Sequence, residues 1–171
     1  LSLVLVAVTA RADVVQASPD GFFIKITASV SAAPDKVYAD IAQVRHWWSD
    51  AYTWSGKAAN LSLAPDAGGC FCERWKDGSA EHGHVVMALP GRLLRLDTAL
   101  GPLQEFALKG ILSFWIAPAA NAGAELDVEY RVNGASSSGL DALAPQVDAM
   151  LGEEVARRAR GSPGEAHPCG S

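Results

Sequence analysis

The sequence predicts an α+β fold in which a curved antiparallel β-sheet wraps around a long C-terminal helix. Two observations lead to this prediction. Six short extended stretches follow one another between residues 60 and 132, separated by turn-rich connections, and a long amphipathic pattern comes after the last of them. Such short connections join antiparallel neighbours, because a parallel crossover needs about a dozen residues or more. One earlier strand and two short helices after it complete the expected order.

The chain opens with an uninterrupted apolar run from Leu1 to Val8, followed by Ala10-Arg-Ala12. A short apolar run before a small-x-small sequence is typical of a secretory signal peptide, and this run is shorter than the ~20 residues that a membrane-spanning helix needs. We therefore expect residues 1–12 to be a signal peptide cleaved near Ala12, and the protein to be periplasmic or secreted. A first β-strand is the alternative, because valine and leucine also favour strands.

The remaining chain has the size and composition of one soluble domain, expected over residues 13–160. The net charge is −5 and no run of basic residues is present, which argues against nucleic acid or an anionic membrane surface as a partner. No second apolar stretch approaches spanning length, so no stable membrane insertion is expected. Residues 161–171 are rich in glycine, proline and serine and are expected to be a disordered tail.

The first expected strand covers residues 22–31, where alternation places Ile24, Ile26, Ala28 and Val30 on one face. Pro34 then suits the first turn of a helix, in which apolar residues recur at helical spacing as far as Trp47 or Trp48. A second short helix or turn is expected directly afterwards.

Period-two alternation and turn residues predict the six strands of the meander at 60–63, 70–75, 80–88, 93–99, 109–117 and 124–132. The final helix carries one apolar stripe, which consists of Leu140, Leu143, Val147, Met150, Leu151 and Val155. Pro145 is tolerated only in a first helical turn, so we expect this helix to begin near residue 142.

The order of these elements, and several local motifs, resemble the SRPBCC (START-like) helix-grip superfamily. The motifs are Ser31-Ala-Ala-Pro-Asp-Lys-Val37-Tyr38, Arg45-His-Trp-Trp48, Gly68-Gly69 before the cysteine strand, Gly83-His-Val85 and Pro90-Gly-Arg-Leu93. The resemblance covers about residues 20–159 and is closest to the branch of polyketide cyclases and homologues of chaperone ATPase activators. It implies a cavity between the sheet and the C-terminal helix that holds a lipid, sterol, polyketide or aromatic molecule, and it implies no reaction.

Aromatic residues are concentrated in the first half of the chain, and large rings suit an apolar pocket as well as a filled core. The expected function is therefore that of an exported protein that binds a small apolar ligand, without catalytic residues or a cofactor. The residues expected to line the cavity are Trp48, Trp54, Phe71, Trp75, His82, Trp115, Val147 and Met150.

Two other functions remain open. An enzyme of the cyclase, aromatase or hydratase type would use the same cavity, with His82 or His84 beside Glu73 as a general base. A protein-interaction module related to chaperone ATPase activators would instead expose an apolar patch.

Two cysteines and two histidines also occur at strand spacing. Cys70 and Cys72 are expected on one face of their strand, and His82 and His84 on one face of the next, so the four side chains form an alternative four-ligand zinc site. Buried, inert cysteines and surface histidines without a metal are the favoured interpretation, because the spacing is not the usual Cys-x-x-Cys. A direct Cys70–Cys72 disulfide is expected to be strained, and Cys169 is a third thiol of unassigned role.

Overall fold

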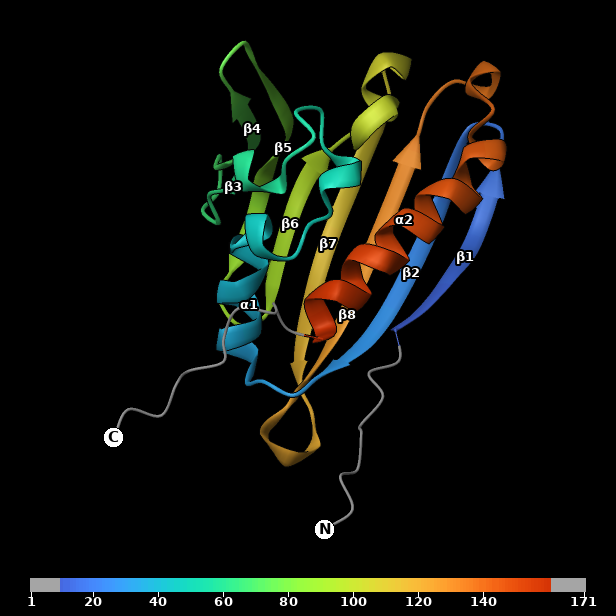
Figure 1. Cartoon of the computed structure of the whole chain (residues 1–171). Coiled ribbons are helices and arrows are strands. Elements are labelled where there is room, and N and C mark those ends of the chain that lie inside the picture. The colour runs from blue at the N-terminus through green and yellow to red at the C-terminus, as the bar shows by residue number, and fades with distance from the viewer. Residues whose placement is uncertain (1–9, 161–171) are drawn as a thin grey trace.

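The computed structural model describes residues 10–160, which form one antiparallel sheet and two α-helices (Figure 1). The sheet has eight strands in the order β1-β2-β8-β7-β6-β5-β4-β3. The strands are β1 (Ala10–Ser18), β2 (Gly21–Val30), β3 (Leu61–Leu63), β4 (Cys70–Trp75), β5 (Gly78–Leu89), β6 (Leu93–Thr98), β7 (Lys109–Pro118) and β8 (Ala124–Asn133). Residues 1–9, the expected tail at 161–171 and Cys169 lie outside the described part.

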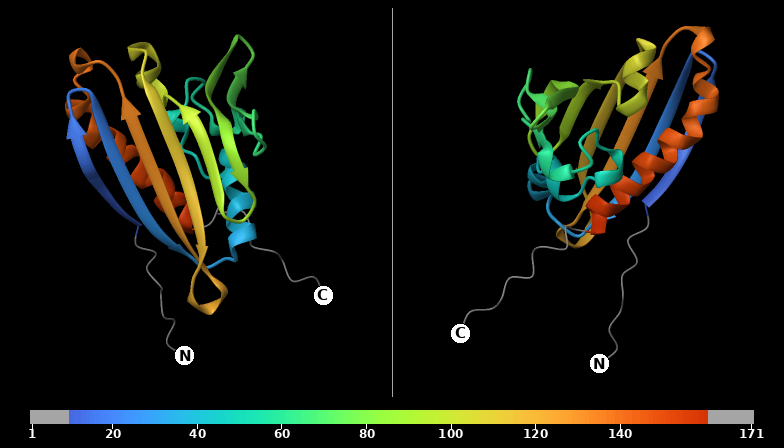
Figure 2. Two further views of the ribbon diagram at one scale, coloured as in Figure 1. Left: turned by 180° about the vertical axis from the view of Figure 1, so that it is seen from behind. Right: turned by 45° about the horizontal axis from the view of Figure 1, so that its top comes forward.

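Helix α1 (Pro34–Ala42) follows β2, and the long helix α2 (Leu140–Arg160) follows β8. Six short 3₁₀ segments lie between the elements: η1 (Val44–His46), η2 (Asp50–Tyr52), η3 (Ala58–Asn60), η4 (Gly101–Phe106), η5 (Ala120–Ala122) and η6 (Ser136–Ser138). Helix α2 crosses one face of the sheet and packs on β1 and β2, and no helix within residues 10–160 covers the opposite face (Figure 2). This is the helix-grip arrangement, so the expected fold class is confirmed.

The six meander strands lie where alternation placed them, with ends that differ by one or two residues. The expected inward face of β2 is also confirmed, because Ile24, Ile26, Ala28 and Val30 are all buried. Among the described residues, no helix combines the length and the apolar character needed to cross a bilayer.

Strand β1 was not expected as such. It pairs antiparallel with β2 from Ala10 opposite Ala28 to Ser18 opposite Gly21, with a bulge between Val14 and Gln16. Polar residues interrupt the apolar pattern of this segment, so the sequence does not show it as a strand. An edge strand tolerates such residues, because part of it faces solvent. The cleavage expected near Ala12 falls within this strand.

The start of α2 corrects the sequence expectation by two residues. The helix begins at Leu140, which is fully buried and whose N–H donates to the carbonyl oxygen of Pro19 at 3.1 Å. Pro145 therefore lies in the second turn, not the first. Because proline has no N–H, the carbonyl oxygen of Asp141 lacks its usual partner within the helix. Asp141 and Pro145 are both exposed, so water can bond to this oxygen instead.

Two polar side chains connect distant parts of the core. The fully buried Tyr130 of β8 donates its hydroxyl hydrogen to the carbonyl oxygen of Thr98 and accepts a hydrogen bond from Leu100 N, both at 3.2 Å. Arg158 of α2 donates from Nη2 to Val37 O at 3.2 Å and to Asp40 Oδ2 at 3.1 Å. These contacts fix the end of β6 and the C-terminal end of α2.

We expect Tyr130→Phe to lower the free energy of unfolding by about 1–3 kcal/mol, because it leaves two buried backbone groups without their partner. Urea unfolding followed by circular dichroism measures the loss. Tyr52→Phe is the matched control, since the Tyr52 hydroxyl bonds to Glu153 at an exposed site and should cost roughly half a kcal/mol or less. Equal losses in the two variants would contradict the role given to Tyr130.

Candidate functional site

A cavity of about 400 Å³ opens between α2 and the end of the sheet. Four parts of the chain surround it: the segment of η2 and its flanks, His82 of β5, the start of η4, and one face of α2. The lining residues are Trp48, Ala51, Tyr52, Thr53, Trp54, His82, Leu100, Gly101, Pro102, Leu103, Leu143, Gln146, Val147 and Met150.

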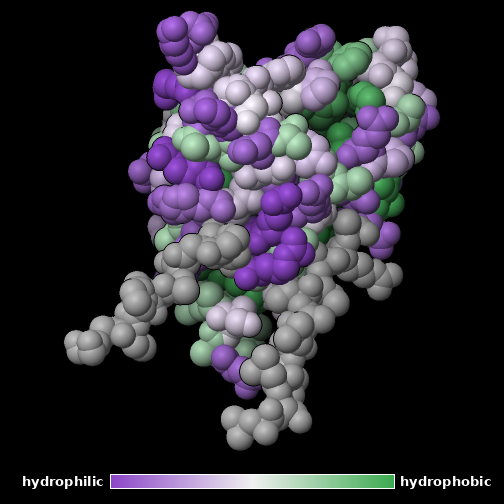
Figure 3. All heavy atoms as spheres, viewed as in Figure 1, coloured by the Kyte–Doolittle hydropathy of each residue, from purple (hydrophilic) through white to green (hydrophobic). Residues whose placement is uncertain are grey.

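The walls of the cavity are predominantly apolar. Leu143, Val147 and Met150 belong to the apolar stripe of α2 and pack against the core, but they are only half-buried because they also border this hollow. In the view of Figure 3, apolar atoms also come to the surface between η4 and the first turns of α2, at the upper right. The cavity is therefore an unfilled part of the core that reaches the surface.

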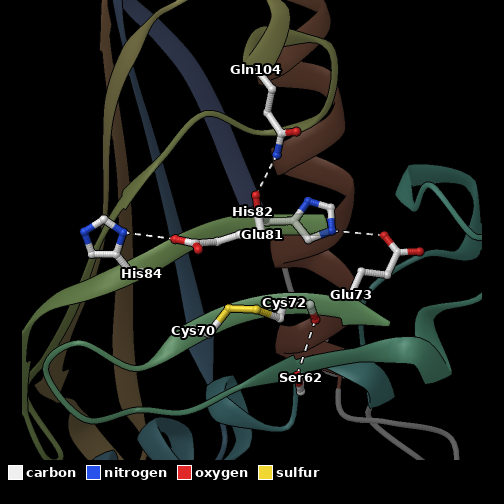
Figure 4. The surroundings of a disulfide bond; sticks show 8 residues. All are labelled: Ser62, Cys70, Cys72, Glu73, Glu81, His82, His84 and Gln104. Atoms are coloured by element: carbon white, nitrogen blue, oxygen red, sulfur yellow. Dashed lines mark hydrogen bonds and ion pairs between the residues drawn. A yellow bond between two sulfur atoms is a disulfide. The ribbon is translucent and has the colours of Figure 1, made fainter. Parts of the chain in front are cut away.

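His82 brings a polar group to this wall. Its side chain is only 5% exposed, and its Nε2 lies 3.0 Å from Oε2 of Glu73 on the neighbouring strand (Figure 4). Its ring packs against Phe71, with the ring centroids 5.0 Å apart. The imidazole is thus held between a carboxylate and an aromatic ring at the edge of the cavity.

Glu73 is fully buried and its carboxylate accepts three hydrogen bonds. Besides His82, the donors are Trp54 N at 3.0 Å and Ser55 N at 2.6 Å. Burial works to raise the pKa of Glu73, but the hydrogen bonds from Ser55, Trp54 and His82 outweigh it and hold that pKa below its ordinary value. Glu73 is therefore a carboxylate at neutral pH.

A β-bulge determines which histidine faces inward. Phe71 pairs with Gly83 and Cys72 with Glu81, so His82 is an extra residue in β5 and the alternation of faces is interrupted. His84 consequently points outward, with a side chain 48% exposed and Nδ1 3.2 Å from Oε1 of Glu81. The expectation that His82 and His84 share one face is wrong for this reason.

Gly83 allows β5 and β6 to approach closely beside this bulge. A Cβ atom at Gly83 would lie 2.5 Å from the carbonyl oxygen of Asp97 and 2.6 Å from Cβ of Thr98 on β6. Thr98 also donates its hydroxyl hydrogen to the carbonyl oxygen of His82. The backbone on both sides of the imidazole is therefore fixed against β6.

The cysteines form a disulfide between Cys70 and Cys72, whose Cα atoms are 5.4 Å apart (Figure 4). Two residues of a flat strand span roughly 6.6 Å, and the bend beside the bulge brings the two Cα atoms well inside the range that a disulfide accepts. The direct bridge is therefore present, and its expected strain stays a prediction. With the thiols joined and His84 turned away, the four-ligand zinc alternative lacks its ligands, and no group of three or more candidate ligands occurs among residues 10–160.

The structure brings five of the eight expected lining residues to the cavity. These are Trp48, Trp54, His82, Val147 and Met150. Phe71 lies behind the wall, with its ring centroid 5.6 Å from that of Trp48. Trp75 packs its ring over Gly78 at the β4–β5 hairpin.

Trp115 lies on the opposite face of the sheet and is corrected as a lining residue. It is 41% exposed, with the guanidinium of Arg95 5.3 Å from its ring centroid. Its neighbours Phe114 and Ile116 point inward, so alternation turns Trp115 outward. The lining residues of η4 were missed, because Gly101-Pro102 indicated only a turn.

Glu154 anchors α2 beside the cavity. Its fully buried carboxylate accepts from Ser49 N, with both oxygens at 3.1 Å. Burial raises the pKa of Glu154 to about 7, against the opposing effects of the Ser49 hydrogen bond and of Arg157. The carboxyl group therefore changes charge near neutral pH.

No protein-family model matches the sequence, and no curated protein matches it either. Solved structures do match. A conserved protein of unknown function from Enterococcus faecalis has a TM-score of 0.62 at 11% identity, over 94% of this chain and 80% of that one. A Rhodobacter sphaeroides protein has a TM-score of 0.55 at 13% identity, and the match covers 88% of this chain and 96% of that one. DynU16, a protein in the dynemicin biosynthetic locus, has a TM-score of 0.57 at 19% identity, and the match covers 82% of this chain and 48% of that one. At these identities the likeness establishes the fold alone.

We expect Glu154→Gln to change the pH dependence of stability. A folded-state pKa near 7, above the ordinary value of 4.5, makes ionisation costly in the folded protein. The penalty is absent below about pH 4.5, grows as pH rises, and is complete above pH 7. The unfolding free energy of the variant minus that of the wild type should therefore rise between pH 5 and pH 8, by up to about 3 kcal/mol. Chemical unfolding of both proteins at the two pH values measures this change. A difference that stays constant with pH would contradict the raised pKa.

We expect the double variant Cys70→Ser, Cys72→Ser to lose no more than about 2 kcal/mol of stability. The bridge joins residues only two apart in sequence, and so short a loop restricts the unfolded chain little. Urea unfolding of the variant, beside wild type with and without dithiothreitol, measures the loss. A much larger loss that reduction of the wild type reproduces would show that the bridge holds the fold together.

Proposed function

We propose that the protein binds a small apolar molecule in the cavity between α2 and the sheet. The observation that carries this proposal is the hollow itself: a cavity of about 400 Å³ whose walls are mainly apolar and aromatic side chains. Pockets for small molecules usually have ~300–1,000 Å³ and walls of this kind, with few polar groups. The size suits a compact molecule.

The apolar stripe of α2 supports the same proposal. Leu143, Val147 and Met150 pack against the core on one side, and the part of their apolar surface that remains uncovered borders the hollow. A guest removes such surface from water, at roughly 25 cal/mol per Å² of apolar area. The binding energy is therefore available without any change in the fold.

A second candidate function is an enzyme that works in the same cavity. The observation that favours it is the Glu73–His82 pair, because a carboxylate that orients an imidazole is the arrangement of a general base and its partner. Replacement of His82 by alanine separates the two functions. An enzyme would keep binding and lose turnover, whereas a binding protein has no turnover to lose.

The neutral fluorescent probe N-phenyl-1-naphthylamine tests binding. We expect its emission to rise on addition of the protein, and we expect Val147→Trp to abolish the rise, because the indole fills the cavity. Val86→Trp is the matched control, since Val86 is 45% exposed on β5 and is not a lining residue.

Circular dichroism establishes that each variant is folded, and Met150→Trp replaces Val147→Trp if the latter is not. Probe emission that is equally strong in the cavity-filled and control variants would mean that the probe binds elsewhere. Absence of any response, for this probe and for a panel of fatty acids, sterols and aromatic compounds, would argue against an apolar binding role.

A further inference from the structure

Two of the buried lining side chains carry polar atoms: the indole N–H of Trp48 already donates to the carbonyl oxygen of Tyr52 at 3.0 Å, which leaves the imidazole of His82. The other polar side chains of the wall are Tyr52, Thr53 and Gln146, of which Tyr52 and Gln146 are exposed. The Thr53 hydroxyl donates to the carbonyl oxygen of Asp50 at 2.8 Å. An apolar guest that carries one polar group therefore meets a single buried polar partner, the imidazole of His82.

The neighbouring carboxylate determines which ring nitrogen donates to it. The carboxylate of Glu73 can only accept hydrogen bonds, so the hydrogen in the 3.0 Å contact with His82 belongs to Nε2. In the neutral ring the second nitrogen, Nδ1, then carries a lone pair. Within residues 10–160, the ring of His82 bonds to Glu73 through Nε2, and Nδ1 has no hydrogen-bond partner.

The orientation of the ring is also fixed. A flip of the imidazole would break the bond to Glu73, and Phe71 packs against one face of the ring. The backbone of His82 is bonded to Thr98, and Gly83 leaves no space for the strand to move toward β6. Such a preorganised acceptor costs little to use when a ligand arrives.

We propose that the cavity selects apolar molecules that carry a hydroxyl group, which donates a hydrogen bond to Nδ1 of His82 while Glu73 acts as the positioning residue. This inference rests on the proposed binding function and names the class of its ligand. A carbonyl oxygen would meet the lone pair of Nδ1 with its own, and an anionic ligand would be repelled by ionised Glu73. The aromatic side chains of Trp48 and Trp54 suit a planar guest.

The wild-type protein tests this preference with two probes that share the naphthalene ring system and differ at one oxygen. Calorimetric titration compares 2-naphthol with 2-methoxynaphthalene, in which a methyl group replaces the hydroxyl hydrogen. One hydrogen bond to a buried, preorganised acceptor corresponds to about tenfold tighter binding of 2-naphthol. We also expect the ¹⁵N resonance of His82 Nδ1 to shift on addition of 2-naphthol and to stay in place with 2-methoxynaphthalene.

Two variants locate the effect. His82→Phe should bind both probes with similar affinity, whereas the control His84→Phe, on the outer face, should keep the tenfold preference. Glu73→Gln tests the positioning role: an amide beside Nε2 no longer confines the proton to that nitrogen. The ¹⁵N spectrum should then show more of the Nδ1–H form, and the preference for 2-naphthol should fall. The wild-type measurements stand if either variant fails to fold.

The outcomes separate this inference from the proposed function. Binding of both probes with equal affinity, or a preference for 2-naphthoate over 2-naphthol, would overturn the hydroxyl selectivity and leave an apolar binding protein. A tenfold preference that survives in His82→Phe would overturn the role of His82. If neither naphthalene nor N-phenyl-1-naphthylamine binds, the proposed function itself fails.

Discussion

The buried carboxylate of Glu73 is the constraint on which the arrangement of this site depends. An ionised group in the interior costs several kcal/mol unless its oxygens are satisfied. Three donors from two other parts of the chain satisfy them here: the backbone at Trp54 and Ser55, and the ring of His82. The loop after η2, strand β4 and strand β5 are thereby held to one point. One wall of the cavity results from the need to compensate a single charge.

The hollow lies along one side of α2, while another side of the helix packs on β1 and β2. Its first residue bonds to Pro19, and near its C-terminal end Glu154 accepts from Ser49 while Arg158 reaches Asp40. Between these anchors, Leu143, Gln146, Val147 and Met150 line the hollow, whereas Ala144 is fully buried in the core. A closer approach of the helix would have to break polar contacts in the interior. The polar anchors therefore keep an apolar space open.

Alternation and turn residues were sufficient to predict the meander and the long helix, because both signals are local. The bulge at His82 could not be predicted, since it depends on how β5 aligns with β4, and it reversed the expected face of His84. The run around Trp115 is apolar on both sides, so only pairing with β6 and β8 shows which residues face inward. Glu73 was recognised as a neighbour of the histidines, but its burial and its backbone donors follow from tertiary contacts alone.

The two 3₁₀ segments at the cavity differ in kind from its other walls. Segments η2 and η4 have three and six residues, whereas α2 and the sheet are long elements with continuous hydrogen bonding. Short segments of this type separate from the rest of a protein at a much smaller free-energy cost than global unfolding. A guest in the hollow would therefore enter and leave past η2 and η4. Substitutions in these two segments would then change the rate of exchange, whereas substitutions at Leu143, Val147 and Met150 would change the apolar area that a guest buries, so affinity and exchange rate could be adjusted separately.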